Sequence, residues 1–174
     1  LFEFTKNFIY KPMRATSLYK QGYVLLESED FPQSETKFNE ATKFALQKKW
    51  FFTYARGYRS HKQYERAAQM YGKILRRFKH DKVAGLEYAE MELYDRANYV
   101  RAEEIVRREV LDSHINDADG LLLLGDVFLE WADVAPEKYE DARTQYATLI
   151  QLYGGTSLYL SRMMRYFIDR KSVV

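Results

Sequence analysis

The chain of 174 residues contains no cysteine, three prolines, three histidines and no long apolar run. The absence of cysteine excludes a disulfide framework and any zinc or iron–sulfur site held by thiolates. The longest apolar runs, such as residues 121–124, are far too short to cross a bilayer, so we expect no membrane insertion. Disulfide scaffolds, thiolate metal sites and transmembrane helices are therefore not expected.

The residues that are present favour a folded protein. Apolar residues make up 47% of the chain and charged residues 30%, whereas disordered chains combine few apolar residues with a high net charge. The length favours one domain with a sizeable core. The 28 aromatic residues are an excess that needs an explanation. Because the chain starts without an initiator methionine or the basic region of a signal peptide, we expect it to be part of a longer protein.

The net charge of +2 conceals two blocks of opposite sign. Residues 43–80 carry eleven basic side chains and one acid, a net charge of +10. Residues 81–141 carry six basic and seventeen acidic side chains, a net charge of −11. Such a charge distribution indicates interactions with partners or self-association, and it does not determine the fold.

One pattern recurs four times: an aromatic residue, then a small residue three positions later, then an apolar residue four positions after that. The small residues are Ser34, Ala67, Ala102 and Ala142, which lie 33, 35 and 40 positions apart. A second small residue precedes the first, second and fourth copies at Gly22, Ala55 and Gly125. In the third copy this position is degenerate and falls on Ala89 or Glu90. An internal period of this length is typical of stacked helical repeats.

Each copy predicts a pair of helices joined by a turn, because apolar residues recur at spacings of three, four and seven. A small residue at the crossing lets the two helices approach closely. Asp30 is an N-cap candidate with a proline in the following turn, and Pro136 suggests the same start for a later helix. Gly154 is a helix stop, and Thr156 is a cap for the next helix. No alternating strand pattern competes, so the fold class is all-α.

These positions resemble the tetratricopeptide repeat (TPR) family. The matching residues are Gly22, Leu25, Ser34, Phe38 and Ala41 in the first copy, Ala55, Tyr58, Ala67, Tyr71 and Ile74 in the second, and Gly125, Phe128, Ala142, Tyr146 and Leu149 in the fourth. The resemblance implies a right-handed superhelical solenoid of α-hairpins, with about four TPR units and a terminal helix. The expected parts are an N-terminal segment or helix (1–14), four helix pairs (15–47, 48–81, 82–115 and 116–153) and a helix that caps or continues the solenoid (156–174).

We expect no enzymatic activity, cofactor or metal. His61, His80 and His114 lie near predicted turns, and none has a second histidine or a cysteine three or four residues away. No nucleophile, Walker or dinucleotide-binding motif occurs. Neighbouring carboxylates such as Glu103 and Glu104 fall in the acidic block, where a solvated helix face is the simpler interpretation.

The TPR resemblance implies a concave groove lined by the first helix of each pair. The expected groove residues are Tyr19, Tyr23, Lys49, Phe52, Arg56, Arg59, Leu122 and Asp126. The alternative for Tyr19, Tyr23 and Phe52 is packing between neighbouring repeats. TPR clamps for a chaperone's acidic tail need Lys and Asn where this chain has Tyr19 and Tyr23, so that ligand is disfavoured.

The preferred function is a protein–protein interaction scaffold that binds a partner segment in its groove. The basic second repeat suggests an acidic partner, and the opposed charge blocks suggest self-association. A place in a bacterial envelope or flagellar complex is a further expectation, and both the cytoplasm and the bacterial periplasm remain open. The alternative is binding of RNA or another nucleic acid along the basic residues Lys48, Lys49, Arg56, Arg59, Lys73, Arg76, Arg77 and Lys79. The acidic block would repel a long phosphate backbone.

Overall fold

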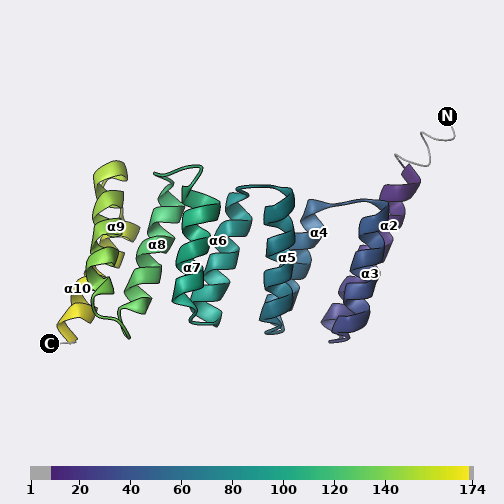
Figure 1. The fold of residues 1–174 in the computed structure, drawn as a ribbon, viewed down its shortest axis with the longest axis horizontal. Helices are drawn as coiled ribbons and strands as arrows, with labels where there is room; N and C mark the ends of the chain where they lie inside the picture. The colour runs from purple at the N-terminus through teal and green to yellow at the C-terminus, as the bar shows by residue number, and fades with distance from the viewer. Residues whose placement is uncertain (1–8, 173–174) are drawn as a thin grey trace. The chain divides into compact units, whose positions relative to one another are not determined.

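The computed structural model describes residues 9–172, and within them the protein is all-α (Figure 1). This range contains nine α-helices, the π-helical segments η2 and η3 and no β-strand. None of its helices combines the length and the apolar character that a membrane span requires. The predicted all-α class is confirmed. The first eight residues of the predicted N-terminal segment lie outside the described range.

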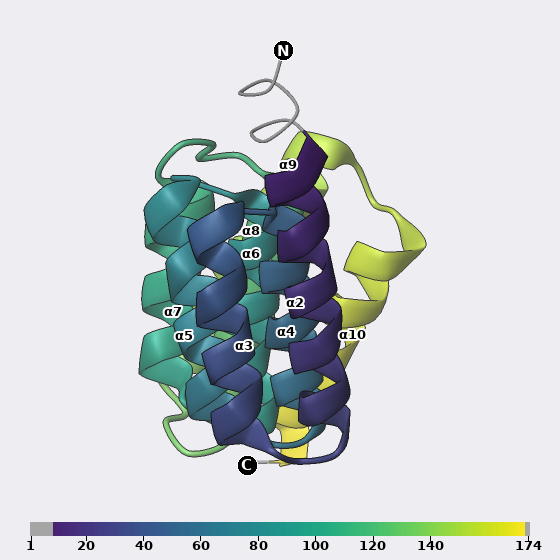
Figure 2. The ribbon, with the colours of Figure 1, turned by 90° about the vertical axis from the view of Figure 1, so that its right-hand side faces the viewer.

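The chain divides into two compact units, the first ending at Arg76 and the second beginning at Arg77. The first unit contains the α2–α3 pair, and α4 also packs against α2. Figure 2 shows α4 behind the α2–α3 pair. The helices of this unit are α2 (Lys11–Glu27), α3 (Phe31–Phe44), α4 (Lys48–Ser60) and α5 (Tyr64–Arg77).

The second unit is built around the long α8–α9 pair, to which α10 is added. A shorter pair precedes it, and in that pair each α-helix continues into a π-helical segment. The elements of this unit are α6 (Lys82–Glu90), η2 (Met91–Asp95), α7 (Tyr99–Ile105), η3 (Val106–Leu111), α8 (Ala118–Trp131), α9 (Lys138–Tyr153) and α10 (Ser157–Ser172).

Most of the predicted helix ends are confirmed. The Asp30 carboxylate accepts a hydrogen bond from the Gln33 amide at 3.2 Å, at the start of α3. Helix α9 ends before Gly154, whose φ of 79° is in the region that favours glycine. The start predicted at Pro136 is wrong, because α9 begins at Lys138. The Pro136 carbonyl instead accepts from Tyr139 in a tight turn ahead of the helix.

Small residues at the predicted positions allow close helix crossings in both units. A Cβ atom on Gly22 of α2 would lie 2.9 Å from Lys37 Cβ and 3.1 Å from the Ser34 carbonyl oxygen, both on α3. A Cβ atom on Gly125 of α8 would lie 2.5 Å from Cε1 of Tyr146 on α9. These separations leave no room for a larger residue, as the repeat pattern predicts.

The degenerate third copy coincides with the two π-helical segments. Ala89 and Ala102 lie 13 positions apart, whereas the corresponding small residues of the first two copies lie 12 apart. A π-helical turn accommodates one extra residue within a helix, and η2 lies between these two alanines. The buried Glu92 closes the turn that follows η2, accepting from Arg96 at 3.0 Å and from the Asn98 side chain at 3.1 Å.

The aromatic excess forms much of the core of the first unit. The Phe38 ring lies 5.3 Å from that of Tyr19, 4.9 Å from that of Phe51 and 4.7 Å from that of Tyr54, centroid to centroid. Tyr58 continues the cluster at 6.1 Å from Tyr54. Edge-to-face rings at these distances fill the space between helices and contribute about 1 kcal/mol per pair beyond area burial.

Candidate partner-binding surface

One stripe of α4 faces away from the aromatic core. It consists of Lys49, Phe52, Arg56 and Arg59, at spacings of three, four and three residues along one helix face. Lys49 and Arg56 are exposed, and Phe52 and Arg59 are half-buried. The opposite side of α4 is buried through Phe51, Tyr54, Ala55 and Tyr58. Four of the eight predicted groove residues therefore form one accessible surface, which we call the α4 stripe.

Cationic groups lie over the aromatic ring at the centre of the α4 stripe. The Arg56 guanidinium lies 5.3 Å from the centroid of the Phe52 ring, and the Lys48 ammonium lies 6.0 Å from it. Such cation–π contacts stabilise by about 0.5–1 kcal/mol at exposed sites. They hold the basic groups beside an apolar side chain that remains half-exposed to solvent. The surface thus combines positive charge with an apolar contact point.

Tyr19 is not part of an accessible groove, although the repeat pattern assigns it there. Its side chain is fully buried, its ring stacks on Trp50 at 5.6 Å, and its hydroxyl donates to the Ala45 carbonyl at 3.0 Å. Burial raises the pKa of the Tyr19 hydroxyl to about 12. The prediction for Tyr19 needs correction, because the residue packs α2 against the start of α4.

Tyr23 lies one turn further along α2 and is half-buried. Its ring contacts Tyr54 edge-on at 5.8 Å. A Cβ atom on Gly57 would lie 3.0 Å from the Tyr23 ring, which shows how closely α2 and α4 approach there. Tyr23 therefore serves mainly in packing, which agrees with the alternative interpretation of the repeat.

In the second unit, Leu122 and Asp126 line one cavity of about 440 Å³. The cavity lies between α6, η2, α8 and α10. Three leucines form its apolar wall, and Tyr94 and Arg162 contribute polar groups. The full lining is Leu86, Glu90, Tyr94, Asp119, Leu122, Leu123, Asp126 and Arg162. The structure thus brings together two predicted groove residues, with Asp119 of the same helix face beside them.

Asp126 is buried and joins four elements. One carboxylate oxygen accepts from the Tyr146 hydroxyl of α9 at 2.7 Å and lies 3.2 Å from Arg162 Nε of α10. The other accepts from the Tyr94 hydroxyl of η2 at 3.3 Å. The expectation that Asp126 contacts a partner needs correction, because α9, η2 and α10 already surround it. Its main role is to connect α8 to these three elements.

Burial raises the pKa of Asp126 above its ordinary value, although Tyr146, Arg162 and Tyr94 oppose the shift. The folded state therefore binds this proton more tightly than the unfolded state does. As the pH falls through the raised pKa toward the ordinary value, protonation of Asp126 adds stability to the second unit, and this stability is lost as the pH rises.

We expect this linkage to appear when the protein is compared with its Asp126→Asn variant. From about pH 7 to about pH 4, the free energy of unfolding of the second unit should change in favour of the unmodified protein. Urea unfolding followed by Trp131 fluorescence in a Trp50→Phe background measures this, since each unit holds one tryptophan. A difference that stays constant with pH would contradict the assignment.

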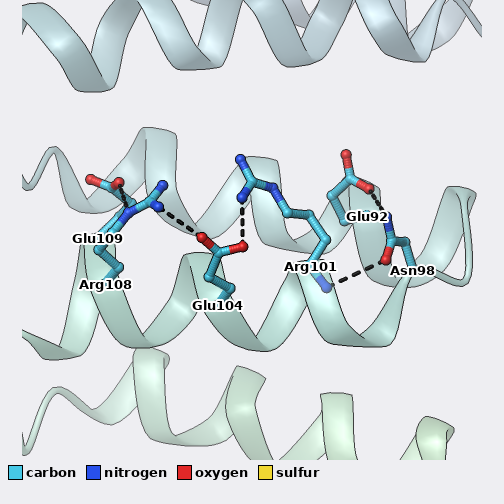
Figure 3. Close-up of polar contacts among 6 residues, drawn as sticks. All are labelled: Glu92, Asn98, Arg101, Glu104, Arg108 and Glu109. Atoms are coloured by element: carbon cyan, nitrogen blue, oxygen red, sulfur yellow. Dashed lines mark hydrogen bonds and ion pairs between the residues drawn. The ribbon is translucent and has the colours of Figure 1, made fainter.

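Many acidic side chains of the acidic block form ion pairs within the second unit. Figure 3 shows Glu104 between two arginines, accepting from Arg101 at 2.6 Å and from Arg108 at 2.8 Å. Arg108 also bonds to Glu109 at 2.7 Å. These exposed pairs each contribute little to stability, but they reduce the negative field along α7 and η3. Glu103 and Glu104 are thus members of a charged helix face.

Within residues 9–172, no group of three or more His, Asp or Glu side chains is placed to hold a metal ion. No family model matches the chain, and no curated protein matches its sequence. The surface chemistry of the chain itself is therefore the basis for proposing a function.

Arg162 and Tyr94 are the residues of the Asp126 cluster that the sequence did not reveal. They reach Asp126 from α10 and η2, at sequence separations of 36 and 32 residues. Tyr94 lies in the degenerate third copy, for which no groove residue was predicted, and its helix turns into the π-helical segment η2. The repeat pattern predicted Tyr146 as a core residue, but it did not predict the hydrogen bond that the Tyr146 hydroxyl donates to Asp126.

Proposed function

We propose that this protein is a non-catalytic interaction scaffold of the TPR type, a right-handed stack of helix pairs that binds a segment of a partner protein. The helix pairs and the small residues at their crossings support this proposal, because the same packing occurs in α2–α3 and α8–α9. Stacked helical pairs form extended concave binding surfaces, and the TPR resemblance implies that the first helix of each pair lines them.

The observation that carries the proposal is the α4 stripe. Phe52 is a half-buried aromatic side chain among the cations of this helix. Arginines and aromatic residues together are enriched at the centres of protein interfaces, where they provide most of the binding energy. The half-buried Phe52 ring, with Arg56 over it at 5.3 Å, is such an arrangement.

Photo-crosslinking tests the proposal. A benzophenone amino acid replaces Phe52 in one variant and Val24 in a control, because Val24 is 68% exposed on the same unit but lies outside the α4 stripe. We expect ultraviolet light in the native host to link a protein at position 52 and not at position 24. A nucleic acid linked at position 52, or no product that depends on position 52, would contradict a protein-binding scaffold.

A further inference from the structure

We propose that the cavity of the second unit is a binding site for an aliphatic ammonium group, the side chain of a lysine in a partner protein. The stem of this lysine lies against the leucines of the cavity, and its ammonium group pairs with Asp119. The site belongs to the second unit, whereas the α4 stripe belongs to the first. It rests on the proposed scaffold function only in taking the lysine from a protein.

The cavity has the size and the apolar wall of a ligand site. Its volume of about 440 Å³ falls within the range of about 300–1,000 Å³ that is typical of such sites. Its wall consists of Leu86 on α6 and the adjacent Leu122 and Leu123 on α8. Leu123 is buried and the other two leucines are half-buried. A ligand with methylene groups is favoured here, because the wall removes them from water.

The cavity can be reached from solvent. Two of its lining residues are exposed: the Asp119 side chain by 65% and Tyr94 by 52%. Asp126, in contrast, is only 5% exposed and accepts from the Tyr146 and Tyr94 hydroxyls. The lining therefore runs from exposed to buried residues, and a flexible side chain can enter without separating the helices.

The exposed side of the cavity carries an excess of negative charge. One ammonium group, that of Lys82, is shared by two carboxylates, at 2.7 Å from Asp117 and 2.8 Å from Asp119. These three side chains together carry one net negative charge. A carboxylate has about four acceptor sites, so Asp119 can accept from Lys82 and from a ligand at the same time. An ammonium group beside Asp119 compensates the remaining charge.

The guanidinium group in the lining does not oppose a cationic ligand. Arg162 reaches the cavity from α10, and its Nε lies 3.2 Å from the Asp126 carboxylate. The charges of this pair offset each other, so the charge that a ligand meets at the exposed side is that of Asp119. An anionic ligand would be repelled there.

Lysine is the side chain that matches this combination of groups. It carries a compact ammonium group at the end of a flexible stem of four carbons. It also buries that stem along apolar surface while its charge stays near water. The leucine wall accommodates the stem, and the exposed Asp119 accommodates the charge. A small amine such as n-butylammonium has the same chemistry, so the experiment below compares the two sources.

NMR titration of the full chain with ¹³C-labelled leucine methyl groups tests the site. The probe is an alanine peptide with one central lysine, and the comparison ligands carry norleucine, acetyl-lysine or glutamate at that position. We expect the lysine peptide to shift the signals of Leu86, Leu122 and Leu123, and the comparison peptides to bind at least about fivefold more weakly. Unchanged leucine signals, or equal binding of a comparison peptide, would overturn the proposal. If n-butylammonium binds as tightly as the lysine peptide, the assignment to a protein side chain is wrong.

Asp119→Asn tests the charged contact. It should weaken binding of the lysine peptide at least about fivefold and leave binding of the norleucine peptide unchanged. Lys82 retains Asp117 at 2.7 Å, so an ion pair at the start of α8 remains. The matched control is Asp112→Asn, which removes the same charge at an exposed position outside the cavity lining and should weaken binding less than about twofold. Equal losses in the two variants would overturn the role of Asp119.

The titration and the crosslinking at position 52 can fail independently. If position 52 crosslinks to a protein while the lysine peptide leaves the leucine signals unchanged, the scaffold function stands and the lysine site is wrong. If the lysine peptide binds in the cavity while position 52 yields no protein, the function proposed from the α4 stripe fails and the lysine site stands.

Discussion

Replacing Gly125 with alanine is expected to lower the free energy of unfolding of the second unit by about 3 kcal/mol. The new Cβ atom would lie 2.5 Å from Cε1 and 3.0 Å from Cζ of Tyr146. The Tyr146 ring has little freedom to move, because it is fully buried and its hydroxyl donates to Asp126 at 2.7 Å. The clash must therefore separate α8 from α9 or break this hydrogen bond. Urea unfolding followed by Trp131 fluorescence in the Trp50→Phe background measures the change.

Gly72→Ala is the matched control for this substitution. Gly72 lies within α5, and the nearest atom to a Cβ at this position is an Arg76 side-chain nitrogen at 3.5 Å, an ordinary contact. Alanine in a helix interior is favoured over glycine, so the first unit should gain up to about 1 kcal/mol. If Gly125→Ala were neutral or stabilising as well, the close crossing of α8 and α9 would be contradicted.

Asp126→Leu is expected to cost the second unit about 3 kcal/mol. Leucine has the same branching as aspartate but is larger and apolar, so it leaves the Tyr146 hydroxyl without its acceptor and removes the carboxylate beside Arg162. A buried donor left unsatisfied costs about 1–3 kcal/mol, and loss of one partner of a buried ion pair adds to that cost. Thermal and urea unfolding measure the loss.

Two companion variants identify the cause of this loss. Asp126→Asn retains an acceptor for Tyr146 and should cost only about 1 kcal/mol at neutral pH. Adding Tyr146→Phe to Asp126→Leu removes the orphaned hydroxyl and should recover part of the stability, a coupling that a double-mutant cycle quantifies. Absence of coupling between positions 126 and 146 would contradict a hydrogen bond that stabilises the unit.

The sequence predicted local structure well because local structure depends on neighbouring residues. The Asp30 cap and the helix end at Gly154 follow from hydrogen-bonding groups and backbone freedom within a few positions. The spacing of Gly22 and Ser34 predicted a close crossing of two helices joined by a short turn. The π-helical segments were not predicted, since one extra residue in a helix has no distinct signature in composition or hydropathy.

The position of a residue in the repeat did not by itself determine whether its side chain is exposed to solvent. Tyr19 and Phe52 occupy equivalent positions in successive repeats, yet Tyr19 is fully buried and Phe52 is half-exposed. Arg56 and Asp126 are likewise equivalent, and Arg56 is exposed whereas Asp126 is buried. The neighbouring helices explain the difference at Asp126, where η2 and α10 supply Tyr94 and Arg162.

The sequence alone determined that this cysteine-free chain is all-α, where several of its helices end, which small residues lie at the helix crossings, and that its charges fall into opposed blocks. Those properties depend on residue type and on short spacings. Only the tertiary structure decided which side chains of the equivalent positions reach solvent, and that Asp126 joins four elements. The accessibility of a side chain and its buried hydrogen bonds depend on residues from distant segments of the chain. Which of these residues come into contact depends on how whole helices pack against one another.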